Sequence, residues 1–150
     1  MPRIACSVRR FTKGKRFAFA SFLLTTHGVS KFLDALIDTG SPDTVLSTRD
    51  ALSMRLPISA MRSGRTVGLA GHSFFNHPLG GATLKFTTDD GGVYVVEMES
   101  VGVLVPTRMD SSTLEAVRPI PSLIGNDLLE DYGFALVFNP RAGVSYLEFS

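Results

Sequence analysis

One short segment of this 150-residue chain places a carboxylate where it could act as an acid or a base. The apolar run 35–37 leads directly into Asp38, Thr39, Gly40 and Ser41, so the carboxyl group comes at the end of an expected buried strand. Burial opposes ionisation of such a group, while neighbouring hydroxyls and turn amides can donate hydrogen bonds that hold it in place. These residues can therefore poise a carboxylic acid for proton transfer. The alternative is a polar corner between a strand and a turn, without chemistry.

A second glycine segment lies near the other end of the sequence. Leu123 and Ile124 precede Gly125, and Asn126 follows as a candidate cap for a short helix over 127–132. Here too, two apolar residues lead into a glycine.

Short strands separated by glycine-containing turns are expected to position both segments. The sequence predicts hairpins over 17–25 and 31–38, 65–69 and 73–79, 81–88 and 93–98, and 134–138 and 144–149. Further strands are expected at 44–47 and 101–105, a helical turn at 49–55 and a surface loop at 106–121. The chain is thus expected to be mostly β, with one or two short helices.

The length fits one compact domain. We expect a basic N-terminal arm or first strand over 1–16, and the domain proper over 17–150. The arm and the apolar run 17–24 together have the charge pattern of a secretory signal, but the run is short and no small-x-small cleavage site follows it. We therefore expect a solvated arm and a cytoplasmic protein.

Composition argues against several partners. With 15 basic and 14 acidic side chains, the chain has a formal net charge of +1, which does not suit binding by phosphate neutralisation. No apolar run approaches the roughly 18 residues that span a bilayer. The single cysteine, Cys6, excludes an internal disulfide, and His72 and His77 have no third ligand nearby. We expect no nucleic acid, no membrane, no metal and no other cofactor.

Taken together, the two segments resemble the retropepsin-like aspartic peptidases, the single-lobed relatives of pepsin. That family shares an apolar-apolar-Asp-Thr-Gly-(Ala or Ser) segment, a flap hairpin, and a later apolar-apolar-Gly segment before a short helix. The order of elements matches over 17–149, and the two segments carry the sequence match. The resemblance implies a small, closed, β-barrel-like fold with a flap hairpin and one short C-terminal helix.

The resemblance also implies an aspartic endopeptidase. In this chemistry two carboxylates about 3 Å apart share one proton. One takes a proton from a water molecule while the other protonates the peptide carbonyl oxygen. Because the chain holds a single Asp-Thr-Gly triplet, an active enzyme must be a homodimer with both Asp38 residues on its two-fold axis.

The family pattern assigns roles to individual residues. Asp38 is implied as the catalytic residue, and its loop is supported by Thr39, Gly40 and Ser41. An extended polypeptide substrate, paired through its backbone, would contact three segments. These are Asp43 and Val45 after the triplet, Leu69, Ala70, Gly71 and His72 in the flap, and Leu123, Ile124 and Gly125 in the second segment. Apolar substrate side chains are expected around the cut bond.

Two positions depart from the retroviral pattern. Pro42 and Asn126 stand where retroviral members carry Asp and Arg, which form an ion pair that helps to lock the dimer. Without it, dimer stability would depend on apolar contacts from 134–149. Two alternatives stay open: the same dimer binds peptides without cutting them, or it is a dimerisation module in which Asp38 is only a turn residue.

Overall fold

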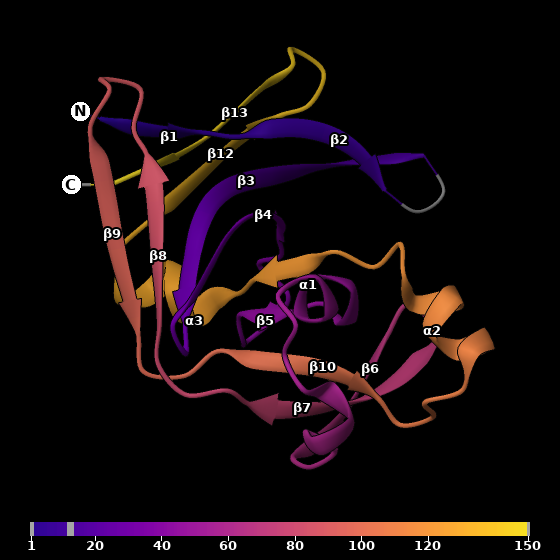
Figure 1. Ribbon diagram of the computed structural model, residues 1–150. Coiled ribbons are helices and arrows are strands. Elements are labelled where there is room, and N and C mark those ends of the chain that lie inside the picture. Colours follow the sequence, from indigo (N-terminus) through magenta and orange to yellow (C-terminus); the bar gives the residue numbers. More distant parts are fainter. Residues whose placement is uncertain (1, 12–13, 150) are drawn as a thin grey trace.

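The computed structural model describes residues 2–11 and 14–149 (Figure 1). The strands are β1 (Arg3–Ala5), β2 (Ser7–Phe11), β3 (Lys15–Thr26), β4 (Val29–Ile37), β5 (Val45–Leu46), β6 (Arg65–Leu69), β7 (His72–Pro78), β8 (Ala82–Thr87), β9 (Val93–Met98), β10 (Gly102–Pro106), β11 (Ser122–Ile124), β12 (Ala135–Asn139) and β13 (Val144–Glu148). The helices are α1 (Thr48–Ser53), α2 (Ser111–Val117) and α3 (Asn126–Asp131), with a 3-10 turn η1 (Ile58–Ala60). The fold is mostly β, as predicted.

Tight turns join consecutive strands. At the β3–β4 turn, His27 and Gly28 both have positive φ, 48° and 74°, which suits a two-residue hairpin loop. Thr26 pairs with Val29 across this turn, and the ladder continues to Phe19 opposite Leu36. The predicted hairpins β3–β4, β8–β9 and β12–β13 are found, and β6 pairs with β7 in the same way.

Ten strands form one bent sheet, in which the path runs β6-β7-β10-β5-β11-β4-β3-β8-β9 and β2 pairs with β3. The prediction of a closed barrel is wrong for the described residues. Closure requires the two end strands of the sheet to pair, and β6 and β9 do not pair with each other. The sheet is therefore open, and the long strand β3 curves through it (Figure 1).

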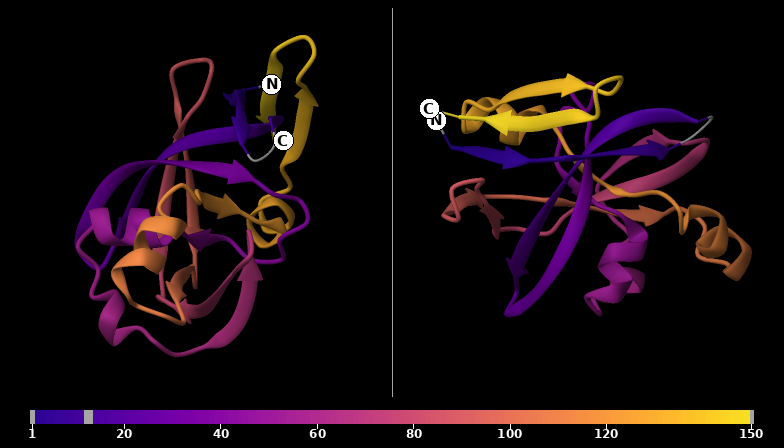
Figure 2. Two further views of the ribbon diagram at one scale, coloured as in Figure 1. Left: turned by 90° about the vertical axis from the view of Figure 1, so that its right-hand side faces the viewer. Right: turned by 90° about the horizontal axis from the view of Figure 1, so that it is seen from above.

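The predicted surface loop 106–121 contains a helix instead. Asp110 caps α2 by accepting a hydrogen bond from the Thr113 N–H at 2.8 Å. Hydrogen bonds from Thr113 and Ser112 lower the pKa of this carboxyl group to about 2. Val117 at the end of α2 is buried, and α2 lies beside α1 (Figure 2). A cap and a buried apolar residue thus outweigh the loop signals of the sequence.

The N-terminal and C-terminal strands lie together (Figure 2). β1 pairs with β13, which also pairs with β12, and β2 continues from β1 to pair with β3. The Cys6 N–H between them donates to Ser145 O at 3.0 Å. Part of the predicted arm is therefore strand, while its residues 1, 12 and 13 lie outside the described residues, as does 150.

The core has two parts. The larger lies between the long strands, and its most enclosed side chains include Leu24, Leu84 and Phe86. The smaller lies under the end of β4 and is formed by Phe19, Leu36, Val45, Phe74, Leu104, Val117, Ile120 and Leu123. Within the described ranges, no helix has the length and apolar character needed to cross a membrane.

Candidate active site

Asp38 lies where β4 ends and the chain turns. Its N–H donates to Ile124 O at 2.9 Å, which extends the parallel pairing of β4 with β11 by one bond. Its Oδ1 accepts a hydrogen bond from the Gly40 N–H at 2.9 Å, and its carbonyl oxygen accepts one from the Ser41 N–H at 3.0 Å. The turn therefore fixes the half-buried carboxyl group by its own backbone, while Thr39 and Gly40 are exposed.

The second glycine segment, around Gly125, packs against this turn and is hydrogen-bonded to it. The Asn126 N–H donates to Ser41 O at 2.8 Å, and Asn126 Nδ2 donates to Thr39 O at 2.7 Å. Gly125 has no room for a side chain, because a Cβ there would lie 2.5 Å from Asp43 C and 2.8 Å from Ser41 O. The glycine lets the two segments pass in contact, and Asn126 ties them together.

A partly buried polar network adds a further connection. Asp127 accepts hydrogen bonds from the Thr44 N–H at 3.0 Å and from Thr44 Oγ1 at 2.7 Å. Thr44 Oγ1 in turn accepts one from the Gly125 N–H at 3.0 Å. One hydroxyl thus bridges the Asp38 loop and the start of α3, and fixes both segments in one geometry.

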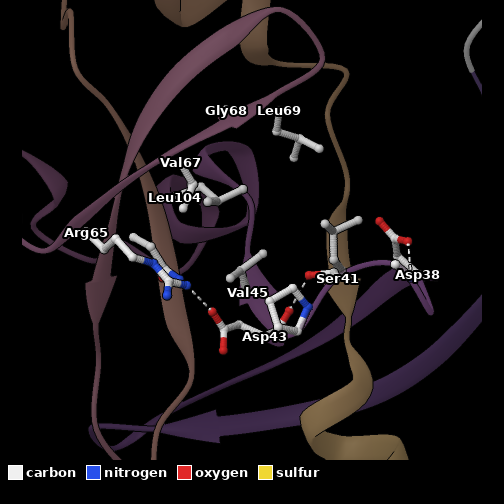
Figure 3. Close-up of a pocket in the computed structure, with 13 residues that line it drawn as sticks. Asp38, Ser41, Asp43, Val45, Arg65, Val67, Gly68, Leu69 and Leu104 are labelled. Carbon is white, nitrogen blue, oxygen red and sulfur yellow. Dashed lines mark hydrogen bonds and ion pairs between the residues drawn. The ribbon is translucent and has the colours of Figure 1, made fainter.

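A cavity of about 290 Å³ opens beside Asp38 (Figure 3). Seven of the residues predicted for the site line it, from all three expected segments. They are Asp38, Gly40, Ser41, Asp43, Val45, Leu69 and Leu123. Val45 and Leu123 also belong to the smaller core, so the floor of the cavity is a packed apolar surface.

The β6–β7 hairpin reaches the cavity with β6 rather than with its tip. Val67, Gly68 and Leu69 line the cavity. Ala70 and Gly71 at the tip have φ of 51° and 80°, and neither they nor His72 line it. Thr39 and the predicted substrate contacts Ile124 and Gly125 are not among the residues that line the cavity either. Ile124 is fully buried.

The sequence analysis missed the polar end of the cavity. Arg65 Nη2 forms an ion pair with Asp43 Oδ2 at 2.7 Å, at the end of the cavity away from Asp38 (Figure 3). Asn76 and Leu104 also contribute to the lining. No local signal marks Arg65, because strand pairing brings it to Asp43 from a distant part of the chain. We expected a preference for apolar substrate side chains, but one end of the cavity is charged.

The other candidate groups lie apart from this cavity. His77 Nδ1 lies 3.1 Å from Ser63 Oγ, and His27 Nε2 lies 2.7 Å from Leu79 O. No group of three or more His, Cys, Asp or Glu residues within 2–11 and 14–149 is placed to hold a metal ion. Cys6 is half-buried, and this burial raises the pKa of its thiol to about 11.

Comparison with known proteins identifies the fold. No protein-family model matches the sequence, and no curated protein matches it. Among solved structures, a retropepsin-like aspartic protease from Rickettsia conorii superposes with a TM-score of 0.50 and 18% identity, over 98% of this chain and 89% of that chain. The EIAV protease in complex with an inhibitor gives a TM-score of 0.42 and 19% identity, over 87% of this chain and 100% of that chain. With the paired strands β4 and β11 ending at Asp38 and Gly125, the first of these likenesses establishes that the chain has a retropepsin-like fold.

Proposed function

We propose that this chain is an aspartic endopeptidase that works as a homodimer. The observation that carries the proposal is the position of Asp38. Its carboxyl group is oriented by the Gly40 N–H and stands at the mouth of a cavity with an apolar floor. The retropepsin-like fold supports the same assignment.

The proposed chemistry needs a second carboxyl group, which Asp38 of another copy would supply. One carboxylate accepts a proton from a water molecule held between the two, and the resulting hydroxide attacks the peptide carbonyl carbon. The other carboxyl group donates its proton to the carbonyl oxygen, giving a neutral gem-diol. The carboxyl group that took the water proton then donates it to the amide nitrogen, while the other carboxylate takes a proton from a gem-diol hydroxyl. The C–N bond breaks, and an amine and a carboxylic acid are released. No covalent intermediate with the protein and no cofactor is needed.

The remaining residues have supporting roles in this proposal. Thr39, Gly40 and Ser41 shape the loop around the carboxyl group, and Asp43, Val45 and Leu123 form subsites for substrate side chains. The β6–β7 hairpin would act as the flap, with Leu69, Ala70, Gly71 and His72 closing over an extended polypeptide and excluding water. Ile124 and Gly125 would act indirectly, by positioning the Asp38 loop.

Replacement of the proposed catalytic group tests the proposal. Asp38→Asn keeps the side-chain shape and the acceptor for the Gly40 N–H, so the fold and the assembly should be unchanged. Cleavage of an unfolded protein at acidic pH, read by gel and mass spectrometry, should fall at least about a thousandfold, since removing any member of a catalytic set costs this order. Asp89→Asn, on an exposed turn, is the matched control. Substantial cleavage by the Asp38 variant would reject Asp38 as the catalyst.

A peptide-binding module without cleavage is the second candidate. Asn126 favours this function, because its side-chain amide donates to Thr39 O of the same subunit. It therefore does not replace the retroviral ion pair that helps to lock the dimer. Retention of a peptide by wild-type protein across a pH series, with no cleavage at any pH, would favour this second function.

A further inference from the structure

A second groove borders β4 and shares no lining residue with the cavity at Asp38. It has a volume of about 570 Å³. The residues that line it are Arg9, Arg10, Phe11, Phe19, Lys31, Phe32, Leu33, Asp34, Arg49, Asp50, Ser53, Pro119 and Pro121. Four of them, 31–34, are consecutive in β4. Because successive side chains of a strand point to opposite faces, four consecutive lining residues mean that the edge of the strand borders the groove. We call this site the β4-edge groove.

The register of the sheet tells which backbone groups face the groove. The Asp38 N–H points to β11, so the even-numbered residues of β4 direct their backbone groups to that side. The pair Thr26–Val29, which closes the β3–β4 hairpin, gives the same assignment. Because this closing pair is hydrogen-bonded, the odd-numbered residues of β4 direct their backbone groups to β3. Phe32 and Asp34 therefore direct their N–H and C=O groups to the side away from β3. The pairing of Ser122 with Ala35 already uses the Asp34 C=O, so both backbone groups of Phe32 and the N–H of Asp34 are left for a ligand.

No strand of the described chain pairs with that part of β4. β11 pairs with Ala35–Ile37 and extends no further. The residues before β11 explain this limit, because Pro121 and Pro119 have no N–H to donate and cannot continue a ladder. The β4-edge groove is thus an unpaired strand edge with room beside it.

The walls of the groove are positively charged. Arg9, Arg10, Lys31 and Arg49 supply four cations. Two of these cations are paired with the lining carboxylates, Arg9 with Asp34 and Arg49 with Asp50 at 3.6 Å, so the lining carries a net charge of +2. Asp34 accepts hydrogen bonds from Arg9 at 3.1 Å and from Ser21, and the buried Asp50 accepts one from Ser122 at 2.6 Å.

An exposed aromatic side chain adds an apolar contact. Phe32 is 77% exposed, the largest exposed fraction among the large apolar side chains described. It lies next to Lys31 on the strand that borders the groove. The site therefore combines free backbone groups, a net positive charge and one large apolar surface.

We propose that the β4-edge groove binds an extended, acidic segment of a polypeptide, which adds to β4 as a further strand. Main-chain hydrogen bonds to both backbone groups of Phe32 and to the Asp34 N–H would supply part of the affinity, as in other cases of strand addition. Acidic side chains of the ligand would meet the arginines, and an apolar side chain would cover Phe32. The proposal does not depend on the function assigned to Asp38.

The charge requirement is tested with full-length Asp38→Asn protein, so that cleavage cannot obscure binding. The probe is a fluorescent octapeptide in which glutamate and valine alternate, and binding is read by fluorescence anisotropy. It should bind, with an affinity that falls as salt increases, and a lysine–valine octapeptide should not bind. Arg10→Glu, and separately Lys31→Glu, should weaken binding about tenfold or more. Arg141→Glu, on an exposed turn that does not line the groove, should leave the affinity unchanged.

The strand-addition requirement is tested with N-methylated peptides. Methylation of alternate residues removes the N–H groups on one edge of the peptide, so one of the two alternating patterns should abolish binding and the other should retain it. Hydrogen exchange of the Phe32 and Asp34 amides should slow when the peptide is bound.

Four results would overturn the proposal. They are equal binding of the glutamate and lysine peptides, insensitivity to both charge reversals, equal binding of both N-methylated patterns, and stronger binding of a single-stranded oligonucleotide of the same charge. Cleavage by wild-type protein, measured separately, distinguishes such a failure from failure of the peptidase proposal.

Discussion

At the scale of single residues, the site depends on backbone groups that hold a carboxyl side chain in place. The Gly40 N–H bonds Asp38 Oδ1 without any contribution from a second subunit. A dimer would then need to align two loops that are already ordered, which lowers the entropic cost of assembling the carboxyl pair. Asn126 contributes to this order through its bond to Thr39 O.

Cys6 gives a prediction for alkaline pH. Burial raises the pKa of its thiol from 9.0 to about 11, so the folded state keeps the proton that the unfolded state loses between these values. Stability should therefore fall by about 2 kcal/mol as pH rises from 9 to 11, since each pKa unit corresponds to about 1.4 kcal/mol. Urea unfolding of wild-type and Cys6→Ala protein at both pH values measures the difference.

The control for this effect is Cys6→Ser. It should also lack the Cys6-dependent loss, because a serine hydroxyl does not titrate in this range. An equal decline in stability for wild-type and Cys6→Ala protein would show that other groups cause it. At neutral pH the thiol should react slowly with alkylating agents, because the thiolate is the reactive form.

Residue identity predicted Asp38 and much of the cavity lining, but not the charged end of the cavity. An apolar run followed by Asp38 marks the end of a buried strand, because adjacent residues in the sequence are enough to predict both the strand and its burial. Arg65 has no such signal. Its contact with Asp43 exists only because β7 pairs with both β6 and β10, and this carries Arg65 over the loop that follows β4.

At the scale of elements, the short strand β11 organises the site. It pairs with β4 in parallel and with β5 in antiparallel orientation, and it ends at Gly125. Three residues of strand thereby bring the second glycine segment against the Asp38 loop. The absence of a side chain at Gly125 is what allows that contact.

Gly125→Ala tests this arrangement. The new Cβ would overlap backbone atoms of Asp43, which cannot move aside as a flexible side chain can. We expect a loss of about 1–3 kcal/mol in the free energy of unfolding, the usual cost of overpacking. Peptide cleavage should fall as well, because the Asp38 loop must shift. Both are measured on purified protein, by urea unfolding and by gel assay.

Gly81→Ala is the matched control. A Cβ at this glycine would lie 3.7 Å from Met98 O, which is an ordinary contact. Its stability should change by less than about 0.5 kcal/mol, as for most surface substitutions. Equal stability of the Gly125→Ala and Gly81→Ala variants would show that close packing at Gly125 does not hold the Asp38 loop in place.

Helix α2 shows where element prediction failed. The segment 106–121 contains prolines and serines, which favour a loop. The middle of the segment nevertheless forms helix α2, with Asp110 as its N-cap. An aspartate at this position does not by itself predict a helix, because the effect of the cap depends on Val117 reaching the smaller core and on α1 lying alongside. Short helices of this kind are stable through packing rather than through local propensity.

At the scale of the whole molecule, the open sheet separates two surfaces. The cavity at Asp38 lies between β6 and the β4–β11 pair, and the β4-edge groove lies beside α1. Closure of the sheet could not be predicted from the sequence, because it depends on whether two distant end strands meet. Local patterns fix the strands themselves, but not the distance between β6 and β9.

The proposed homodimer predicts a specific result when subunits are mixed. If each active unit needs Asp38 from two copies, then mixing wild-type and Asp38→Asn protein at constant total concentration should lower activity as the square of the wild-type fraction. Proteolysis of a fluorogenic protein substrate, after time for subunit exchange, measures this curve. Dilution of wild-type protein with an unrelated inert protein at the same total mass is the control. A linear dependence on the wild-type fraction would contradict the shared site.

The pairing of β1 with β13 has a consequence for how the chain could be reconnected. Arg3 lies opposite Glu148 in an antiparallel ladder, so a short linker between the two ends would turn these strands into an ordinary hairpin. A circular permutant opened in the turn between β12 and β13 would make the β1–β13 contact local, but it would also turn the β12–β13 hairpin into a contact between the new ends of the chain. Because contacts between distant residues slow folding, and the β12–β13 ladder has five residue pairs against three for β1–β13, such a permutant is expected to reach the same structure more slowly.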